Sequence, residues 1–351
     1  MSETPIISII APTRDRSAAL GRLAVSLTRC LDAGFPWELV VVDNGSTDDT
    51  AEVSRRAADA LLGVTVKYVE ESVPGLHAAR HRGAREAEAD VLVFVDDDIE
   101  VSPSWLPALR DEFLDSRVEL VGGPSLPRYE VPPPHWIEWT WKWQPDGTRW
   151  CGPLSLLESG PSRHQIDPIL VWGLNFAIRR DTLLRLRGFH PDALPWDLRR
   201  YRGDGETGLS LKARAEGVQA WYCPQALVYH DVPATRLTTE YFLRRSFLQG
   251  ISDSFTVVRA RRGLVPPDVE SRYARARRLA GHASHPRRWL AGRDPAAVLE
   301  RRMREAYADG YAFHQAEVAS DPALLAWVLR DDYMGDADPR LSVSAAGRDH
   351  D

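Results

Sequence analysis

Short apolar runs alternate with longer amphipathic stretches through the first hundred residues of the chain. The runs cover residues 6–11, 37–42, 64–70 and 91–95. Runs of this length between polar segments are typical of buried strands, whereas the stretches between them have helical spacing. Ser17, and Ser46 or Thr47, are placed to cap the first two helices. The order predicts a parallel, doubly wound sheet whose strands end at one edge.

The fourth run leads directly into three carboxylates, Asp96, Asp97 and Asp98. Ligands of open α/β sheets bind beyond the carboxyl ends of the strands. Adjacent carboxylates repel one another and are costly to bury without a cation, and hard oxygen ligands favour Mg²⁺ or Mn²⁺. The triplet therefore indicates either a divalent-metal site or a solvated acidic turn. Asp43, at the end of the second run, should face the same crevice.

Beyond residue 100 the pattern changes, and the elements are less regular. We expect a helix at 103–114, strands at 119–122 and 170–178, a helix to 186, a helix at about 206–216, two short strands reaching His230, and helices at 238–260 and on to 329. Residues 132–150 hold five of the twelve tryptophans between prolines. This segment is either an aromatic mini-core beneath a loop or a stacking wall for a sugar or aromatic acceptor.

Composition places the chain among soluble globular proteins. It has 351 residues, 44% hydrophobic and 27% charged, enough for one large or two modest domains. Its three cysteines are widely spaced, which favours a reducing compartment over a disulfide framework. No apolar run approaches the roughly 18 residues of a membrane span. We also find no basic and apolar leader, so a cytoplasmic protein is expected.

Charge is distributed unevenly along the chain. The net charge is −6, yet residues 236–304 hold 16 arginines against six acidic residues, a local charge of about +10. Three interpretations are open: solvated helix faces, a lid or homodimer surface, or peripheral contact with the anionic inner face of a membrane. Nucleic-acid binding is not expected, because no nucleic-acid-binding motif accompanies the arginines.

Several motifs in order resemble the family 2 glycosyltransferases of the GT-A fold. They are APTRDR, VVVDNGSTDDT, the stretch from PGLHAAR to VFVDDD, WGLNFAIRRD, GDGETGLSLKARAEG and VYH, and they span residues 6–263. The resemblance implies a mostly parallel, doubly wound α/β sheet. Its nucleotide-binding half would cover residues 1–100 and its acceptor half 101–235. A helical C-terminal extension would follow at 236–334, with a disordered tail at 335–351.

The resemblance also assigns roles to individual residues. Nucleotide contacts are implied for Ala11, Pro12, Thr13, Arg14, Asp43, Gly75, Arg80, Asp96 and Asp97. Asp98 would ligate Mn²⁺ or Mg²⁺, with Asp96 and His230 as further ligands. The acceptor would contact Trp139, Trp141, Trp172 and Asn175. Glu206 matches the family's general base when the motif is aligned on Leu209, and Asp204 is the alternative base.

The implied activity is inverting transfer of a sugar from a nucleoside-diphosphate donor to a hydroxyl. UDP-sugars are the first choice of donor, with dTDP- and GDP-sugars as alternatives. The acceptor would be a glycan, a lipid-linked compound or a secondary metabolite. Two other functions compete: a non-catalytic glycan- or nucleotide-binding module, and a sugar nucleotidyltransferase. The latter is disfavoured because the loop APTRDRSAAL lacks the glycines of that class.

Overall fold

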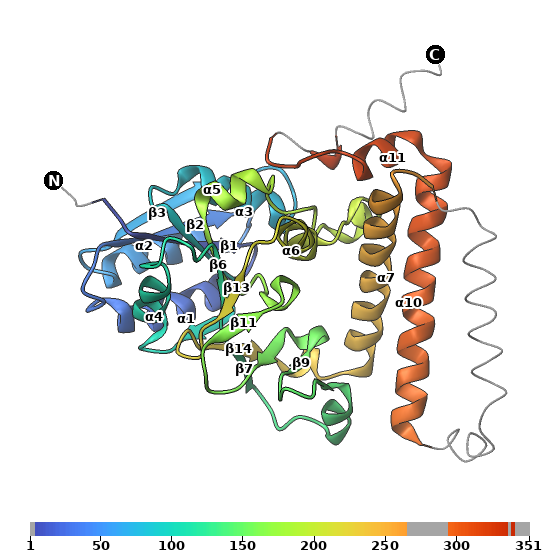
Figure 1. The fold of residues 1–351 in the computed structure, drawn as a ribbon, viewed down its shortest axis with the longest axis horizontal. Helices are drawn as coiled ribbons and strands as arrows, with labels where there is room; N and C mark the ends of the chain where they lie inside the picture. Colours follow the sequence, from blue (N-terminus) through green and yellow to red (C-terminus); the bar gives the residue numbers. More distant parts are fainter. Residues whose placement is uncertain (1–3, 265–293, 336–337, 341–351) are drawn as a thin grey trace.

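The computed structural model describes residues 4–264, 294–335 and 338–340. Two sheets lie beside a layer of long C-terminal helices (Figure 1). The predicted α/β architecture is confirmed. Most of the predicted tail at 335–351, and the middle of the arginine-rich segment, lie outside the described residues. The predicted domain boundaries at residues 100, 235 and 334 stay predictions.

The first sheet has eight strands in the order β11-β13-β6-β12-β4-β1-β2-β3. Their bounds are β1 Ile7–Thr13, β2 Trp37–Asp43, β3 Thr65–Glu70, β4 Val91–Val95, β6 Leu120–Gly122, β11 His164–Ile166, β12 Asn175–Arg179 and β13 Ala220–Tyr222. Strands β3, β2, β1 and β4 run parallel, as predicted. β12 runs antiparallel to β4, with Asn175 opposite Val95. This reversal brings the residues before β12 to the edge where the aspartates follow β4.

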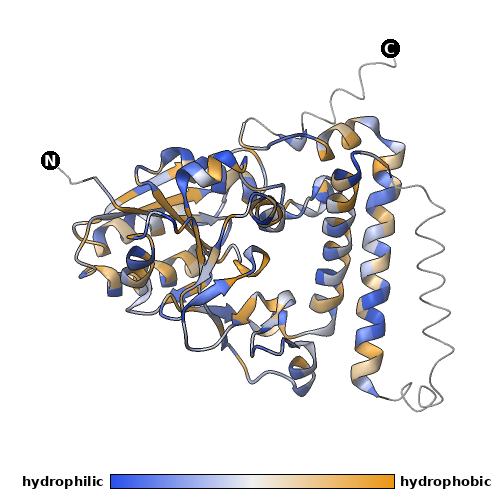
Figure 2. Cartoon of the chain, viewed as in Figure 1, coloured by the Kyte–Doolittle hydropathy of each residue, from blue (hydrophilic) through white to orange (hydrophobic). Residues whose placement is uncertain are grey.

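Helices cover both faces of this sheet, which explains the continuous apolar runs. They are α1 Ser17–Leu27, α2 Thr50–Ala60, α3 Leu76–Glu86, α4 Trp105–Glu112, α5 Arg180–Arg185 and α6 Gly205–Ala215. Neighbouring residues of β1 point to opposite sides, so Ile9 packs in the core that contains α1 and α4. Ile10 packs in the core that contains α3, α5 and α6. Figure 2 shows hydrophobic residues gathered along the central strands.

The predicted helix caps are wrong. Arg16 is the N-cap residue of α1, and its own side chain makes no capping hydrogen bond. α2 begins at Thr50, later than Ser46 or Thr47 would place it. Asp48 takes the capping role instead: one carboxylate oxygen accepts the backbone N–H of Ser17 (2.9 Å), and the other accepts that of Thr50 (3.1 Å). One aspartate thus ties the starts of two helices together.

A second sheet of six strands, which the sequence pattern did not predict, packs beside the first. Its order is β5-β14-β7-β10-β9-β8, with β5 Ile99–Val101, β7 Ser125–Tyr129, β8 Lys142–Trp143, β9 Arg149–Cys151, β10 Leu156–Glu158 and β14 Val228–Val232. Short 3₁₀ helices of one or two turns connect the elements: η1 Thr28–Cys30, η2 His135–Thr140, η3 Gly152–Leu154, η4 Pro168–Leu170, η5 Trp196–Tyr201 and η6 Ala234–Arg236. Within the tryptophan-rich segment, Trp136 packs edge-on against Phe242, with ring centroids 4.9 Å apart.

Three C-terminal helices complete the described fold: α7 Thr239–Arg261, α10 Pro295–Ser320 and α11 Pro322–Val328. α7 and α10 lie side by side (Figure 1). Their close approach needs glycine, because a Cβ at Gly250 would overlap the Tyr307 carbonyl and one at Gly310 would overlap that of Phe247. No helix among the described residues has the length and apolar character to cross a membrane.

Candidate active site

A cavity of about 310 Å³ opens at the edge of the first sheet where β1 and β4 end. Eight residues predicted from the sequence line it: Pro12, Thr13, Arg14, Arg80, Asp96, Asp97, Glu206 and His230. Further arginines join them: Arg16 from the loop after β1, and Arg202, Arg236 and Arg245 from distant parts of the chain. We call this space the donor cavity. Its lining of arginines and carboxylates suits an anionic ligand held together with a cation.

Asp97 is buried against the loop after β1. Thr13 donates a hydrogen bond to its Oδ2 (2.8 Å), and Arg16 forms an ion pair with its Oδ1 (2.7 Å). Burial raises the pKa of Asp97 to about 7, although the Arg16 charge acts in the opposite direction. Asp97 therefore fixes the loop and lies close to its proton-binding midpoint at neutral pH.

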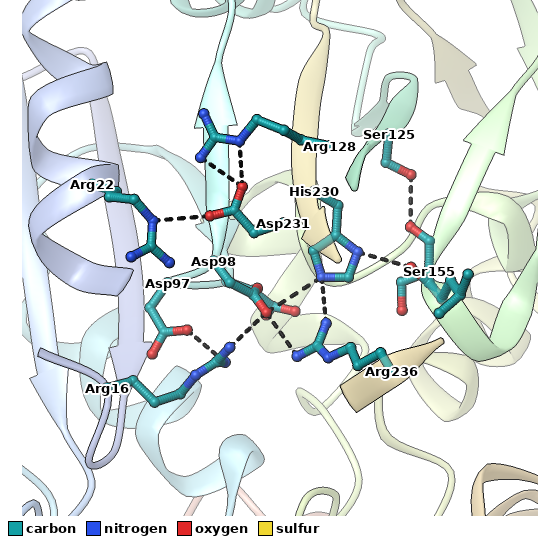
Figure 3. A network of polar contacts seen from close by, with 12 residues as sticks. Arg16, Arg22, Asp97, Asp98, Ser125, Arg128, Ser155, His230, Asp231 and Arg236 are labelled. Atoms are coloured by element: carbon teal, nitrogen blue, oxygen red, sulfur yellow. Dashed lines mark hydrogen bonds and ion pairs between the residues drawn. The ribbon is translucent and has the colours of Figure 1, made fainter. Parts of the chain in front are cut away.

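Asp98 lies at the centre of a network of cations (Figure 3). Its Oδ2 accepts from Arg16 (2.7 Å) and from Arg236 (2.8 Å), and His230 Nε2 is 3.4 Å away. Burial alone would raise the pKa of Asp98. The guanidinium groups of Arg16 and Arg236 oppose burial and hold that pKa well below its usual range. The Asp98 carboxylate is therefore ionised throughout the physiological pH range.

Asp98 and His230 have the donor atoms that a divalent metal needs. Asp98 Oδ1 is buried and accepts no hydrogen bond within the described residues. The Nδ1–H of His230 donates to the Leu154 carbonyl (2.8 Å), which leaves Nε2 with its lone pair toward Asp98. No group of three or more His, Cys, Asp or Glu gathers for a metal within the described residues. A metal held here would need further ligands from phosphate or water.

Arg80 connects the end of β4 to the start of α6. Its side chain is 2% exposed, and it donates to Asp96 Oδ1 (3.3 Å) and to Glu206 Oε2 (3.5 Å). The guanidinium lies 5.1 Å from the centroid of the Phe189 ring. A Cβ at Gly173 would overlap this guanidinium, so the sequence before β12 leaves room for it. Asp96 is thus paired with Arg80 and is not part of a cluster with Asp98 and His230.

The two candidate bases have different surroundings. Asp204 is buried: His190 Nδ1 lies 2.6 Å from its Oδ1, and Thr256 donates to its Oδ2 (2.6 Å). Glu206 is 28% exposed and lines both the donor cavity and a second cavity. Glu206 is accessible to a ligand, whereas both oxygens of Asp204 are already occupied by protein groups.

The second cavity measures about 520 Å³, and we call it the acceptor cavity. Trp139, Trp150 and Trp172 contribute aromatic surface to its wall. Helices α7 and α10 contribute the rest of the C-terminal wall, with Arg245, Ser246 and Gln249 from α7 and Ala296, Leu299, Glu300, Met303, Arg304 and Tyr307 from α10. Ser155, Glu206 and Arg245 line both cavities. The two spaces therefore meet beside a carboxylate.

Comparisons with known proteins identify relatives of the N-terminal part of the chain, which supplies part of this site. Residues 8–163 match the model of the family described as glycosyl transferase family 2. We call this matched segment, residues 8–163, the family 2 region. Over 110 residues, the chain is 36% identical to validoxylamine A glucosyltransferase of Streptomyces hygroscopicus subsp. limoneus. The match covers 31% of this chain and 24% of that protein, so it spans about a quarter of the relative's length.

Two further proteins extend the comparison. Glycosyltransferase AglE of Haloferax volcanii is 29% identical over 122 residues, which are 35% of this chain and 40% of that protein. The mannosyltransferase PcManGT from Pyrobaculum calidifontis was solved in complex with GDP-Man and Mn²⁺. Its fold matches 98% of this chain and 81% of its own, with a TM-score of 0.51 at 19% identity. The GT-A fold is thereby confirmed beyond the family 2 region.

Besides Asp98 and Asp204, five residues singled out from the sequence line neither of these cavities: Ala11, Asp43, Gly75, Trp141 and Asn175. Asp43 accepts from the Ser46 backbone (2.7 Å) and from Tyr68 (2.7 Å). The amide of Asn175 bonds Trp105 (3.0 Å) and the Ala226 carbonyl (2.8 Å), which is a structural role. Of the remaining three, Ala11 is buried in β1, Gly75 precedes α3 with a positive φ, and the Trp141 ring stacks on Arg149.

Sequence reasoning missed several residues of the site. Arg16 is inside the APTRDR motif of the family 2 region, where an arginine before a helix gave no signal of its own. Arg236 and Arg245 lie outside that region and reach the site only through tertiary packing. The C-terminal wall of the acceptor cavity was likewise not predicted, because the sequence of α10 has the pattern of an ordinary amphipathic helix and no binding motif.

Proposed function

We propose that this protein is an inverting glycosyltransferase that moves a sugar from a nucleoside-diphosphate donor to an acceptor hydroxyl. One observation carries the proposal: a cavity lined with arginines and aspartates meets a cavity lined with tryptophans at Glu206. The first suits the nucleoside diphosphate, and the second suits a ring-shaped acceptor. The family 2 assignment of residues 8–163 supports the same activity.

Glu206 would act as the general base. Inversion needs a base on the face of the sugar opposite the leaving group, so the base must reach both substrates. Glu206 is the acidic side chain in the described part of the chain that lines both cavities. Arg80, 3.5 Å from its carboxylate, would orient it. Asp204 would hold His190 and the start of α6 in place.

Charge on the departing diphosphate would be neutralised from the other side of the donor cavity. Arg16 and Arg236 are already gathered there around Asp98. Mn²⁺ or Mg²⁺ held by Asp98 and His230 would add Lewis-acid stabilisation of the leaving group. The buried, unpartnered Oδ1 of Asp98 supports such a site, and Mn²⁺ accompanies the donor in the PcManGT complex.

A UDP-sugar is our first choice of donor. This choice rests on the resemblance alone, because Asp43, the residue expected to accept the imide N–H of uracil or thymine, lines neither cavity and already accepts from Ser46 and Tyr68. dTDP-sugars therefore fit the same reasoning, whereas the GDP-Man of PcManGT supports a guanine nucleotide as the third choice. The acceptor would be a glycan, a lipid-linked compound or a secondary metabolite that presents a hydroxyl to Glu206.

A screen of UDP-, dTDP- and GDP-sugars tests the proposal. With Mn²⁺ or Mg²⁺ present, the correct donor should raise the melting temperature, because ligand binding stabilises the folded state by mass action. The same donor should be consumed in the presence of candidate acceptors, with inverted anomeric configuration by NMR. Metal-dependent nucleotide binding without turnover across the acceptor panel would favour a binding module. No binding of any nucleotide sugar would contradict the donor site.

From the arginine excess of residues 236–304 we predicted a lid, a dimer surface or a membrane contact, and this stays a prediction. Part of the charge has another use in the described residues. Arg236 pairs with Asp98, Arg259 donates to the Val328 and Arg330 carbonyls (2.6 Å each), and Arg304 pairs with Glu300. Flotation with anionic liposomes at low and high salt tests the membrane contact, and absence of binding at low salt would eliminate it.

A further inference from the structure

A single guanidinium contacts both side chains that would hold the metal. Arg236 is the last residue of η6 and lies six positions beyond His230. Its Nη2 donates to Asp98 Oδ2 (2.8 Å), and its Nη1 donates to His230 Nε2 (2.8 Å), as Figure 3 shows. Arg236 therefore lies on the side of the Asp98–His230 pair that a divalent ion would approach.

The His230 ring leaves no second lone pair for a metal. Because Nδ1 carries the proton donated to the Leu154 carbonyl, Nε2 is the acceptor, and Arg236 occupies it. A metal ion would require that same lone pair. It would also carry two positive charges into a position in direct contact with a guanidinium. Arg236 and the metal therefore compete for one place.

Arg16 does not take part in this competition. It bridges Asp97 and Asp98 (2.7 Å each) and makes no contact with His230, so it can remain when a metal binds. Arg236 has somewhere to go: its side chain is 21% exposed and lines the donor cavity. Asp98 and His230 are each only 3% exposed and are held in place. A diphosphate in the cavity would offer the displaced guanidinium a bidentate partner.

We propose that Arg236 is an exchangeable counter-ion, which holds Asp98 and His230 in the empty site and passes to the donor diphosphate when a metal enters. The inference rests on the proposed function and adds a role for a residue outside the family 2 region. Its consequence is coupling. Metal alone must displace Arg236 without a new partner for it, whereas metal and diphosphate together satisfy all the charges. By linkage each ligand should strengthen the other by the same factor.

Arg236→Gln tests the exchange, with Arg22→Gln as the matched control. Arg22 pairs with Asp231, the neighbour of His230, and contacts neither Asp98 nor His230. Binding of Mn²⁺ alone is measured from the free-ion EPR signal. Binding of UDP, dTDP and GDP is measured by calorimetry with and without Mn²⁺. Circular dichroism and a thermal melt confirm that each variant is folded.

We expect Arg236→Gln to bind Mn²⁺ alone more tightly and metal-free diphosphate more weakly than the wild type. The coupling between the two ligands should fall below the wild-type factor, which we expect in the usual range of roughly 5- to 150-fold. The part of the coupling that comes from direct ligation of the metal by the diphosphate should remain. Arg22→Gln should retain all three values. These opposite changes distinguish exchange from a structural role, which would weaken both ligands.

Two outcomes overturn the inference, and they are distinguishable. If the wild type binds Mn²⁺ and the folded Arg236→Gln protein binds it equally or more weakly, the exchange is wrong and the metal site stands. If the wild type binds no Mn²⁺ even with each diphosphate, the metal site in the proposed function is wrong, and the exchange falls with it.

Discussion

The donor and acceptor cavities are built in different ways from the same chain. The donor cavity is held by ion pairs, such as Arg16 with Asp97 and Asp98. Its acidic lining comes equally from the family 2 region, with Asp96 and Asp97, and from beyond it, with Asp192 and Glu206. The acceptor cavity combines tryptophans and apolar side chains with polar ones, and its α7 and α10 wall lies outside that region. Under the proposed function, residues on both sides of residue 163 would build the reaction centre, whereas the helices beyond it would bear on the choice of acceptor.

Replacing the residue shared by both cavities should have the largest effect. Glu206→Gln keeps the shape of the side chain but cannot accept a proton, so we expect transfer to fall by roughly 10²- to 10⁴-fold. Donor and metal binding should be retained, because the amide still fits beside Arg80. Turnover is measured with the donor and acceptor identified in the screen, and donor affinity by calorimetry.

Asp204→Asn is the control for this prediction. Its side chain lines neither cavity, and it bonds His190 and Thr256. We expect about 1 to 3 kcal/mol of lost stability, the usual cost of leaving a buried partner unsatisfied, with transfer largely retained. If Asp204→Asn is folded but inactive while Glu206→Gln transfers sugar, the roles of the two carboxylates must be exchanged.

Asp98→Asn should disable the donor cavity and spare the acceptor cavity. The amide keeps the volume of the carboxylate but is a poor metal ligand and a poor partner for Arg16 and Arg236. We expect the Mn²⁺-dependent part of donor affinity to weaken by at least roughly 100-fold, because losing a direct ligand should cost no less than losing a hydrogen-bond partner of a ligand. Calorimetry with UDP in Mn²⁺ measures it. Unchanged affinity in a folded variant would contradict the metal role.

The strand ends of the donor cavity were readable from sequence for a physical reason. A buried strand needs a continuous apolar run, so the position where VLVFV stops also locates the aspartates. The division of labour among them was not readable. Asp97 is fixed by Thr13, Asp96 by Arg80 and Asp98 by Arg236, which is 138 positions away.

The acceptor cavity was mostly hidden from sequence. Its wall depends on the packing of α10 against α7, which Gly250 and Gly310 permit, and neither glycine has a local signal. The second sheet was missed because its strands are short, down to two residues in β8, and pair across long stretches of chain. Trp139 and Trp172 were identified, but Trp141 and Asn175 have no contact with the cavity that their motifs suggested.

Acid should loosen the contact between the family 2 region and the C-terminal segment. His77 of α3 packs edge-on against Tyr333, with ring centroids 6.3 Å apart, and neither ring nitrogen has a hydrogen-bond partner in the described residues. Burial lowers the pKa of His77 to about 4; Asp192 opposes this shift, and His190 and Arg80 add to it. The folded protein therefore holds this histidine neutral at pH values where an unfolded chain would protonate it.

The sign of the pH effect follows from that difference. Between pH 6.5 and 4 the unfolded state binds a proton that the folded state does not, so stability falls as the pH falls through this window. From pH 7 to pH 5, His77 should cost about 2 kcal/mol, roughly a 30-fold change in the folding equilibrium. Urea unfolding at both pH values measures it. His77→Leu should reduce the loss, and replacing the exposed His135 should not; equal losses in all three proteins would contradict the assignment.

The smallest expected effect comes from replacing a tryptophan of the acceptor cavity. It tests whether that ring contacts the acceptor, in contrast to a nearby tryptophan outside the cavity. Trp172 lines the acceptor cavity, whereas Trp143 is 65% exposed and lines neither cavity. If the acceptor ring stacks on Trp172, Trp172→Ala should raise the acceptor KM by roughly 3- to 10-fold, because a stacked ring contributes about 0.5 to 1.5 kcal/mol beyond its buried area. Trp172→Phe should recover part of the loss, and Trp143→Ala should change nothing.

The calorimetric affinity for UDP should stay constant in all three variants, since the diphosphate is bound by charge in the other cavity. A loss of UDP affinity in Trp172→Ala would show instead that the two cavities form one site. The contrast between a charged donor cavity and an aromatic acceptor cavity would then not describe how this protein binds its two substrates.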